Sequence, residues 1–289
     1  MESLKHKISS YPKPEDLFSK NILKGYLAKP GADFFNVDNL KKAFSLIDFT
    51  TLDVTDTKFK VGNLCRKVNS LAGIFPGVPN VAAICVYPAL VGEVKKQLKV
   101  PGVQIASVIG GFPASQTFLE LKTLEAKMAI DAGATEADMV ISVGKFLEGN
   151  YQEVFDEIVA IKAVLGSAHL KVILETGALN HEQIYHASLL AMEAGADFIK
   201  TSTGKFNPAA TPEAMAIMCL AINEFQKKHK KKIGIKPAGG IASAEDAMLY
   251  FSIVKNILGD DWLNNKLFRI GASRLATKLL EKISEQEGR

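Results

Sequence analysis

Short apolar runs alternate with longer amphipathic stretches along most of the chain, from about residue 39 onward. The stretches between the runs, such as 119–132 and 182–194, have the 3.6-residue period of helices that bury one face. Strands that alternate with helices pair in parallel through right-handed crossovers, and eight such units close a barrel. We therefore predict an α/β protein with a single (β/α)8 TIM barrel. The eight apolar runs lie at 45–50, 81–87, 103–109, 137–143, 170–176, 196–202, 233–238 and 268–272.

An open, doubly wound sheet would show the same alternation of strands and helices. Such sheets normally carry a GxGxxG turn after a strand, and this sequence has none. The barrel is accordingly assigned to residues 39–289. Residues 1–38 contain Pro12, Pro14, Pro30 and Gly31, which interrupt helices, and we expect a helical or irregular N-terminal extension packed outside the barrel.

Composition and charge argue against two classes of binding partner, nucleic acids and membranes. The 289 residues are 47% hydrophobic and 23% charged, with a formal net charge of only +4. Aromatic residues do not interleave with the basic ones, so we expect neither nucleic acid nor a membrane as a partner. The basic run at 227–232 follows a helical pattern and is interpreted as a solvated helix C-terminus, where cations complement the helix dipole.

Cysteine and histidine spacing argues against metal or disulfide chemistry. The three cysteines, Cys65, Cys85 and Cys219, are far apart and form no CxxC, which fits a reducing cytoplasm. His181 and His186 are separated by one residue more than in HExxH, so on a helix they point about 140° apart. We therefore expect no metal and no other cofactor.

Four charged residues interrupt apolar runs where strands are expected: Asp48, Asp138, Lys200 and Lys236. Burying a charge in a strand is costly unless the charge is paired. Active sites of barrels lie at the C-terminal ends of the strands, and Lys200 and Lys236 fall at the same level of the neighbouring sixth and seventh strands. This placement favours a functional role over isolated lysines that reach the rim.

Two adjacent lysines suggest a nucleophilic amine. Repulsion between two ammonium groups and partial burial both lower a lysine pKa. Moving it from near 10.4 to about 7 to 8 corresponds to roughly 4 kcal/mol, which burial and a cationic neighbour can supply. Such an amine forms a Schiff base with a carbonyl substrate. The residues alone do not decide which lysine is the nucleophile.

Three loops that follow the last strands are rich in glycine and small hydroxyl residues: 201–205 (TSTGK), 237–240 (PAGG) and 271–273 (GAS). Each loop alone could be ordinary turn chemistry. Together, and with Lys205, they present free backbone N–H groups and a cation where barrels commonly bind phosphate. We therefore expect a phosphorylated substrate.

Seven stretches between residues 45 and 280 resemble the deoxyribose-phosphate aldolase family, most specifically in the pair DFIKTSTGK and KPAGG. The matching stretches are LIDFTTL (46–52), VAAICVYP (81–88), GATEADMV (133–140), LKVILETG (170–177), GADFIKTSTGK (195–205), IGIKPAGGI (233–241) and FRIGAS (268–273).

The resemblance implies a class I aldolase that reversibly cleaves 2-deoxy-D-ribose 5-phosphate to D-glyceraldehyde 3-phosphate and acetaldehyde. It implies that Lys200 forms the Schiff base, that Lys236 lowers its pKa, and that Asp138 works with Lys236 in proton transfer. It further implies that two groups of residues bind substrate. Asp48, Cys85 and Thr203 would line the pocket, and the phosphate would contact Gly204, Lys205, Gly239, Gly240, Gly271 and Ser273.

Three positions depart from the family pattern. Arg274 stands where many relatives have a small residue, and Ala242 where an arginine is common. Residues 286–289 carry no tyrosine, although relatives often have one in a tail that assists proton transfer. The contribution of these positions is left open, as is self-association into a dimer or tetramer.

Two other functions share these features. A different Schiff-base barrel enzyme, such as a transaldolase or another phosphosugar aldolase, would accept larger ketose donors. A non-catalytic barrel that only binds phosphosugars would need no second lysine, so the set of Lys200, Lys236 and Asp138 counts against it.

Overall fold

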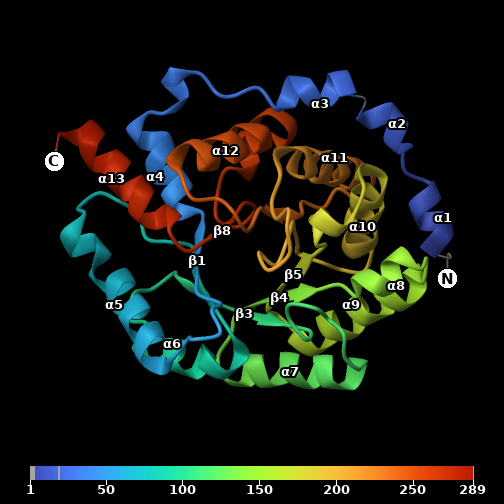
Figure 1. Ribbon diagram of the computed structural model, residues 1–289, viewed down its shortest axis with the longest axis horizontal. Coiled ribbons are helices and arrows are strands. Elements are labelled where there is room, and N and C mark those ends of the chain that lie inside the picture. Colours follow the sequence, from blue (N-terminus) through green and yellow to red (C-terminus); the bar gives the residue numbers. More distant parts are fainter. Residues whose placement is uncertain (1–3, 19, 289) are drawn as a thin grey trace.

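The computed structural model describes residues 4–18 and 20–288, and eight parallel strands form its centre (Figure 1). The strands pair in the order β7-β6-β5-β4-β3-β2-β1-β8. Parallel bridges from Ile235 to Phe268 and from Ala238 to Gly271 join the first and last members, so the sheet closes. The predicted (β/α)8 barrel is confirmed. Its strands are β1 (Ile47–Thr50), β2 (Ala83–Val86), β3 (Gln104–Ile109), β4 (Glu136–Val140), β5 (His169–Ile173), β6 (Phe198–Lys200), β7 (Gly234–Lys236) and β8 (Ile270–Ala272).

Every predicted apolar run overlaps one of these strands, with the runs at β4 and β5 beginning one residue late, and several runs extend past the strand end. The run 137–143 continues into α8 (Val143–Leu147), and 170–176 continues into a turn where Glu175 has φ 57°. These extra residues are apolar or buried because the chain remains packed where it leaves the barrel wall. Apolar character therefore marks burial, and hydrogen bonding decides where the strand stops.

The helices that follow the strands form an outer ring around the barrel (Figure 1). The predicted helices at 119–132 and 182–194 agree with α7 and α10 to within one residue at each end. Capping boxes at Asn180 and Ser243 fix where α10 and α12 begin. The ring consists of α4 (Val37–Ser45), α5 (Lys58–Ile74), α6 (Val91–Gln97), α7 (Leu119–Asp131), α8, α9 (Tyr151–Leu165), α10 (His181–Glu193), α11 (Pro212–His229), α12 (Ala244–Leu258) and α13 (Leu275–Glu287), with short turns η2 (Pro88–Leu90), η3 (Thr176–Ala178) and η4 (Asp260–Trp262).

The N-terminal segment runs along the outside of this ring, over α10, α11 and α12 (Figure 1). It comprises α1 (Leu4–Ser9), α2 (Pro14–Leu17), α3 (Lys20–Tyr26) and η1 (Ala32–Phe34). Tyr11 is buried there and donates a hydrogen bond of 2.7 Å to Glu193 of α10. The division into an extension (1–38) and a barrel domain (39–289) stays a prediction, and α4, which begins at Val37, spans that boundary.

The basic run at 227–232 begins in the last turn of α11, which ends at His229. Lys228 and His229 are not only solvated, because both contact the N-terminal segment and Glu193. Among the described residues, no helix combines the length and apolar character needed to cross a membrane.

An aromatic ring packs inside the barrel next to β7. The ring of Phe198 occupies the space beside β7, where Gly234 has no side chain to compete with it. A Cβ atom at Gly234 would lie 2.2 Å from Phe198 Cε1. The ring packs beside the charged side chains of the interior, with its centroid 5.8 Å from Lys171 Nζ and 5.7 Å from the guanidinium carbon of Arg269.

Candidate active site

Lys200 and Lys236 are the last residues of neighbouring strands and lie at the same level. Lys200 ends β6, Lys236 ends β7, and their Cα atoms are register partners. Both side chains point into the barrel interior and are buried. The expectation that the two lysines lie close together is confirmed.

Asp138 of β4 joins the two lysines across the barrel interior. Its Oδ2 atom accepts hydrogen bonds from Lys200 Nζ at 2.8 Å and from Lys236 Nζ at 2.6 Å. Lys236 Nζ also donates to Asp48 Oδ2 at 2.5 Å. Lys236 thus contacts two carboxylates, whereas Lys200 shares one carboxylate with its neighbour.

Three more charged residues, which the sequence analysis did not single out, belong to the same interior. Lys171 of β5 donates to Glu136 Oε2 at 2.6 Å and to Asp138 Oδ1 at 3.1 Å. Arg269, just before β8, pairs with Glu136 and with Asp48. All three interrupt or border apolar runs, so the pattern that revealed Asp48 and Asp138 could have revealed them too.

The electrostatic environment makes the two lysines unequal. Burial lowers the pKa of Lys200 below its ordinary value, and the ammonium of Lys236 lowers it further, against the opposing effect of Asp138. Burial would also lower the pKa of Lys236, but Asp138 and Asp48 raise it above its ordinary value. Lys200 is therefore the lysine that more readily loses its proton, and Lys236 stays an ammonium.

The carboxylates of the interior remain ionised. Burial by itself would raise the pKa of Asp138, yet Lys171, Lys200 and Lys236 hold it well below its ordinary value. The pKa of Asp48 is likewise lowered, because Lys236 and Arg269 outweigh the effect of burial. Asp138 can therefore accept a proton from either amine or return one over a distance of less than 3 Å.

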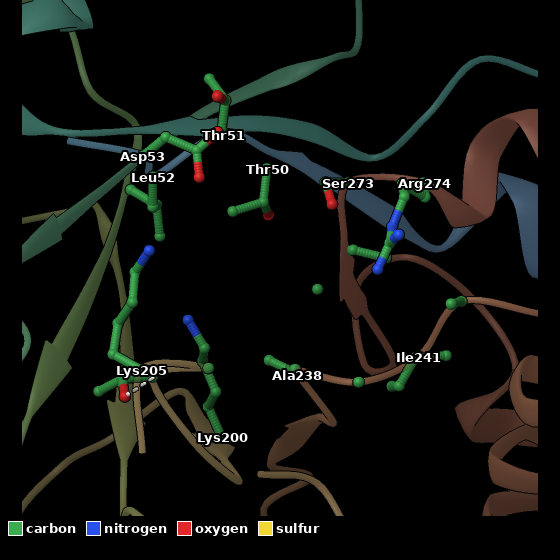
Figure 2. A pocket seen from close by; sticks show the side chains of 17 residues that line it. Thr50, Thr51, Leu52, Asp53, Lys200, Lys205, Ala238, Ile241, Ser273 and Arg274 are labelled. Carbon is green, nitrogen blue, oxygen red and sulfur yellow. Dashed lines mark hydrogen bonds between the residues drawn. The ribbon is translucent and has the colours of Figure 1, made fainter. Parts of the chain in front are cut away.

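A cavity of about 240 Å³ opens at the C-terminal ends of the strands, and the side chain of Lys200 lines it. Figure 2 shows Lys200 and Lys205 directing their amines into the same open space, with Ser273 and Arg274 on another side. Asp48 and Cys85, which we expected to line this pocket, do not border it; both are fully buried. Cys85 instead packs in a small apolar cluster with Val108 and its neighbours.

The glycine-containing loops meet around this cavity. It is bordered by Thr203, Gly204, Lys205, Gly239, Gly240, Gly271 and Ser273, all expected from the sequence, together with Ala242 and Arg274. Gly204 and Gly239 both have positive φ, and a Cβ at Gly239 would lie 2.9 Å from the Cα of Gly204. Glycine is required where two backbones approach this closely.

Arg274, one of the departures from the family pattern, is exposed and borders the cavity. It is the N-cap residue of α13, next to Ser273. In Figure 2 its guanidinium reaches toward the space between the glycine loops. With Lys205 it adds positive charge to a rim that is otherwise rich in backbone N–H groups, which suits a phosphate.

Glu175 holds the loop that carries Thr203. Its carboxylate accepts hydrogen bonds from Thr203 N at 3.1 Å and from the Thr203 hydroxyl. The left-handed backbone at Glu175 turns this side chain toward the neighbouring strand end. Glu175 was not predicted from the sequence, because an acidic residue at the end of an apolar run is also typical of an exposed loop.

Gly271 leaves room for the lysine below the cavity. A Cβ atom at this position would lie 2.8 Å from Ala238 Cβ and 3.1 Å from Lys236 Cε. The glycine thus serves packing around Lys236 as well as bordering the cavity.

Within residues 4–18 and 20–288, no group of three or more histidine, cysteine or acidic side chains is arranged to hold a metal ion. His181 and His186 border different surface hollows, in line with their predicted separation on α10.

Comparisons with known proteins agree with the barrel and its chemistry. A family model described as DeoC/LacD family aldolase matches residues 42–256. The deoxyribose-phosphate aldolase of Homo sapiens is 44% identical over 256 residues, covering 84% of this chain and 80% of that protein. The Mus musculus protein of the same name is 43% identical over the same shares.

A solved structure shares the fold. The deoxyribose phosphate aldolase from Aeropyrum pernix, described as having a unique tetrameric structure, superposes with a TM-score of 0.66 at 27% identity. The match covers 94% of this chain and all of that one.

Proposed function

This chain belongs to the DeoC/LacD family of aldolases, and from that premise we propose that it reversibly cleaves 2-deoxy-D-ribose 5-phosphate to D-glyceraldehyde 3-phosphate and acetaldehyde. One observation carries the proposal. The amine of Lys200, whose pKa is lowered, borders a cavity that also contains a phosphate-compatible rim. An amine and an anion site that border the same cavity suit an aldehyde that carries a phosphate.

The chemistry begins with the neutral Lys200 amine, which attacks the C1 aldehyde of the open-chain sugar. Loss of water gives an iminium, which accepts the electron pair when the C2–C3 bond breaks as the C3 hydroxyl loses its proton. D-Glyceraldehyde 3-phosphate leaves, and the enamine on Lys200 is protonated at C2 and hydrolysed to acetaldehyde. Because the iminium is the electron sink, we expect no metal to be needed and turnover to survive EDTA.

Asp138 and Lys236 are placed to move the protons of this sequence. Asp138 Oδ2 contacts both amines, so it lies next to the atom that becomes the imine nitrogen. Lys236, held as an ammonium by Asp48 and Asp138, is a proton donor beside that nitrogen. Asp48 positions Lys236 rather than contacting substrate, because it is buried away from the cavity.

The phosphate would bind where the glycine-containing loops, Lys205 and Arg274 border the cavity. Backbone N–H groups of the loops that contain Gly204 and Gly240, with Ser273, form the binding surface, and Lys205 and Arg274 supply charge. The same arrangement would accept other phosphosugar aldehydes or ketoses, so a different Schiff-base aldolase or a transaldolase is the second candidate.

Borohydride trapping tests the proposal and separates the candidates. Acetaldehyde with borohydride should add about 28 Da to the peptide that contains Lys200, since the reduced imine leaves an ethyl group. Labelling confined to Lys236 would reverse the assignment of the nucleophile. Faster cleavage of dihydroxyacetone-type ketose phosphates than of deoxyribose 5-phosphate would favour the second candidate.

We also propose that the chain self-associates with a second copy through α7. Its residues Leu121, Leu124 and Met128 are spaced three and four apart and are 53%, 52% and 61% exposed, and Phe118 just before the helix is 75% exposed. Figure 1 shows α7 on the outer rim, away from α1–α3. A continuous apolar face of this kind marks an interface.

Sedimentation velocity tests the self-association. The double variant Leu121→Lys, Met128→Lys should be smaller than the wild type, whereas Ile74→Lys, an exposed apolar residue at the end of α5, should not be. A wild type that sediments as a monomer would refute the assignment.

A cytoplasmic location is proposed as well. It is supported by the three cysteines, which are all free thiols and buried, as expected in a reducing compartment. Fractionation of the native host with an antibody to the chain is the direct check.

A further inference from the structure

The ion-pair network inside the barrel holds one more base than carboxylate. Ion pairs connect four bases and three carboxylates, all of them buried. At most three of the four bases can be balanced by a carboxylate. The bases are Lys171, Lys200, Lys236 and Arg269, and the carboxylates are Asp48, Glu136 and Asp138.

Arg269 makes three hydrogen bonds to the carboxylates, more than any of the three lysines makes. Its guanidinium donates to Glu136 Oε1 at 2.7 Å, to Glu136 Oε2 at 3.0 Å and to Asp48 Oδ1 at 2.7 Å. An arginine does not give up its proton in a protein, so its positive charge in this interior is permanent. Glu136 and Asp48 therefore each balance part of the charge of Arg269 at every pH of interest.

The three lysines share the remaining negative charge of the carboxylates unequally. Lys171 contacts Glu136 and Asp138 and also lies 3.9 Å from Asp48 Oδ2, and Lys236 contacts Asp48 and Asp138. Lys200 contacts Asp138 alone, through the oxygen it shares with Lys236. Lys200 is also the only one of these three lysines that borders the cavity. The surplus proton of the interior therefore leaves most easily from Lys200.

We propose that Arg269 is a positioning residue for Lys200: its fixed charge, placed on Glu136 and Asp48 at the far side of the interior, makes Lys200 the base without a carboxylate of its own. The proposal rests on the proposed function only in that Lys200 is the nucleophile. Arg269 does not border the cavity and so touches no substrate. It acts through Glu136, Asp48 and the two lysines that these carboxylates hold.

Removing Arg269 should abolish the surplus of bases over carboxylates in the network. Three carboxylates would then face three lysines, and each lysine would keep its proton. The groups that face Lys200 directly, Asp138 from β4, Lys236 from β7 and Cys85 from β2, would be unchanged, as would Lys205 in the cavity. Any shift in the titration of Lys200 would therefore arise from the balance of charge deeper in the barrel.

The test is the pH dependence of the reactivity of Lys200, read by mass spectrometry after brief labelling with acetic anhydride. This readout needs no turnover. Arg269→Met should move the profile toward alkaline pH, and a shift of about one unit would slow labelling at pH 7 about tenfold. Glu136→Gln removes a carboxylate instead and should move the profile toward acid pH.

Three further variants separate charge from structural damage. The double variant Arg269→Met, Glu136→Gln restores one surplus base, so its profile should return toward that of the wild type. Arg269→Lys keeps the charge and should keep the profile. Lys122→Met is the matched control, because it breaks a buried ion pair with Glu157 (3.0 Å) between α7 and α9, outside the interior. It should lower stability and leave the Lys200 profile unchanged.

The outcomes are distinct. A wild-type profile in Arg269→Met, or shifts of Arg269→Met and Glu136→Gln in the same direction, would overturn the role of Arg269. Opposite shifts with recovery in the double variant would support it. If the shifts appear but the wild type fails to cleave deoxyribose 5-phosphate, the proposed function fails while the role of Arg269 stands.

Discussion

Lys200 and Lys236 share a single oxygen atom, Asp138 Oδ2, at 2.8 and 2.6 Å. Two ammonium groups on one carboxylate oxygen cannot both be fully balanced, and Lys236 has a second carboxylate in Asp48. The proton is therefore lost from Lys200 first. This relationship assigns the two lysines different roles that their similar sequence contexts do not distinguish.

Replacing Lys236 by leucine should raise the pKa of Lys200. The change removes a repelling ammonium and leaves Asp48 and Asp138 with less positive charge, and both effects favour protonated Lys200. A shift of two units would reduce the reactive amine at neutral pH about a hundredfold. Imine trapping with acetaldehyde and borohydride, followed against pH, measures the shift. Trapping should recover at high pH, whereas turnover should not, because a proton donor is also lost. An unchanged pH profile would show that Lys236 does not tune the nucleophile.

Asp138→Asn should preserve imine formation at neutral pH and reduce turnover. Without the carboxylate, the pKa of Lys200 should fall further, so trapping at neutral pH should persist. Turnover should fall by about 10²–10⁴, the usual contribution of a positioned acid or base. Single-turnover trapping and steady-state kcat on the same preparation give the comparison. Equal losses in both would indicate that Asp138 only maintains the structure.

Lys205→Met tests the phosphate end of the cavity. The variant should lose about ten- to a hundredfold in kcat/KM for deoxyribose 5-phosphate, since a hydrogen bond to a charged group contributes roughly 1.5–3 kcal/mol. Its activity on unphosphorylated deoxyribose, which we expect to be low in the wild type, should change little. Lys266→Met, a lysine at the opposite end of the barrel beside Arg269 and His169, is the control. A similar loss of kcat/KM on deoxyribose 5-phosphate and on unphosphorylated deoxyribose would show that Lys205 does not bind the phosphate.

Gly234→Ala should destabilise the packing of Phe198 against β7. The added methyl group would lie within 2.6 Å of three ring atoms of Phe198, and overpacking of this kind costs about 1–3 kcal/mol. Urea unfolding followed by circular dichroism measures the change. Gly73→Ala in α5 is the matched control, because nothing lies within 4 Å of its Cβ position and alanine favours the helix. Wild-type stability in Gly234→Ala would mean that the Phe198 ring moves aside without cost.

The sequence by itself determined the barrel, its eight strands and the neighbouring lysines. These features follow from local patterns, because the alternation of strands and helices sets a parallel order, and that order makes the sixth and seventh strands neighbours. The glycine-containing loops after the last strands were also predicted to lie together, and Gly204, Gly239 and Gly271 all border one cavity.

Only the tertiary structure decided how the charges inside the barrel are shared. Arg269 meets Asp48 across 221 positions of the chain and Glu136 across 133, which no local pattern reports. Asp48 and Cys85 were predicted to line the pocket; both are fully buried and neither borders the cavity, because the tilt and stagger of the strands set the depth at which an inward side chain sits. Alternation along a strand says which residues face inward. The closed barrel decides which of them meet, and therefore which lysine can lose its proton.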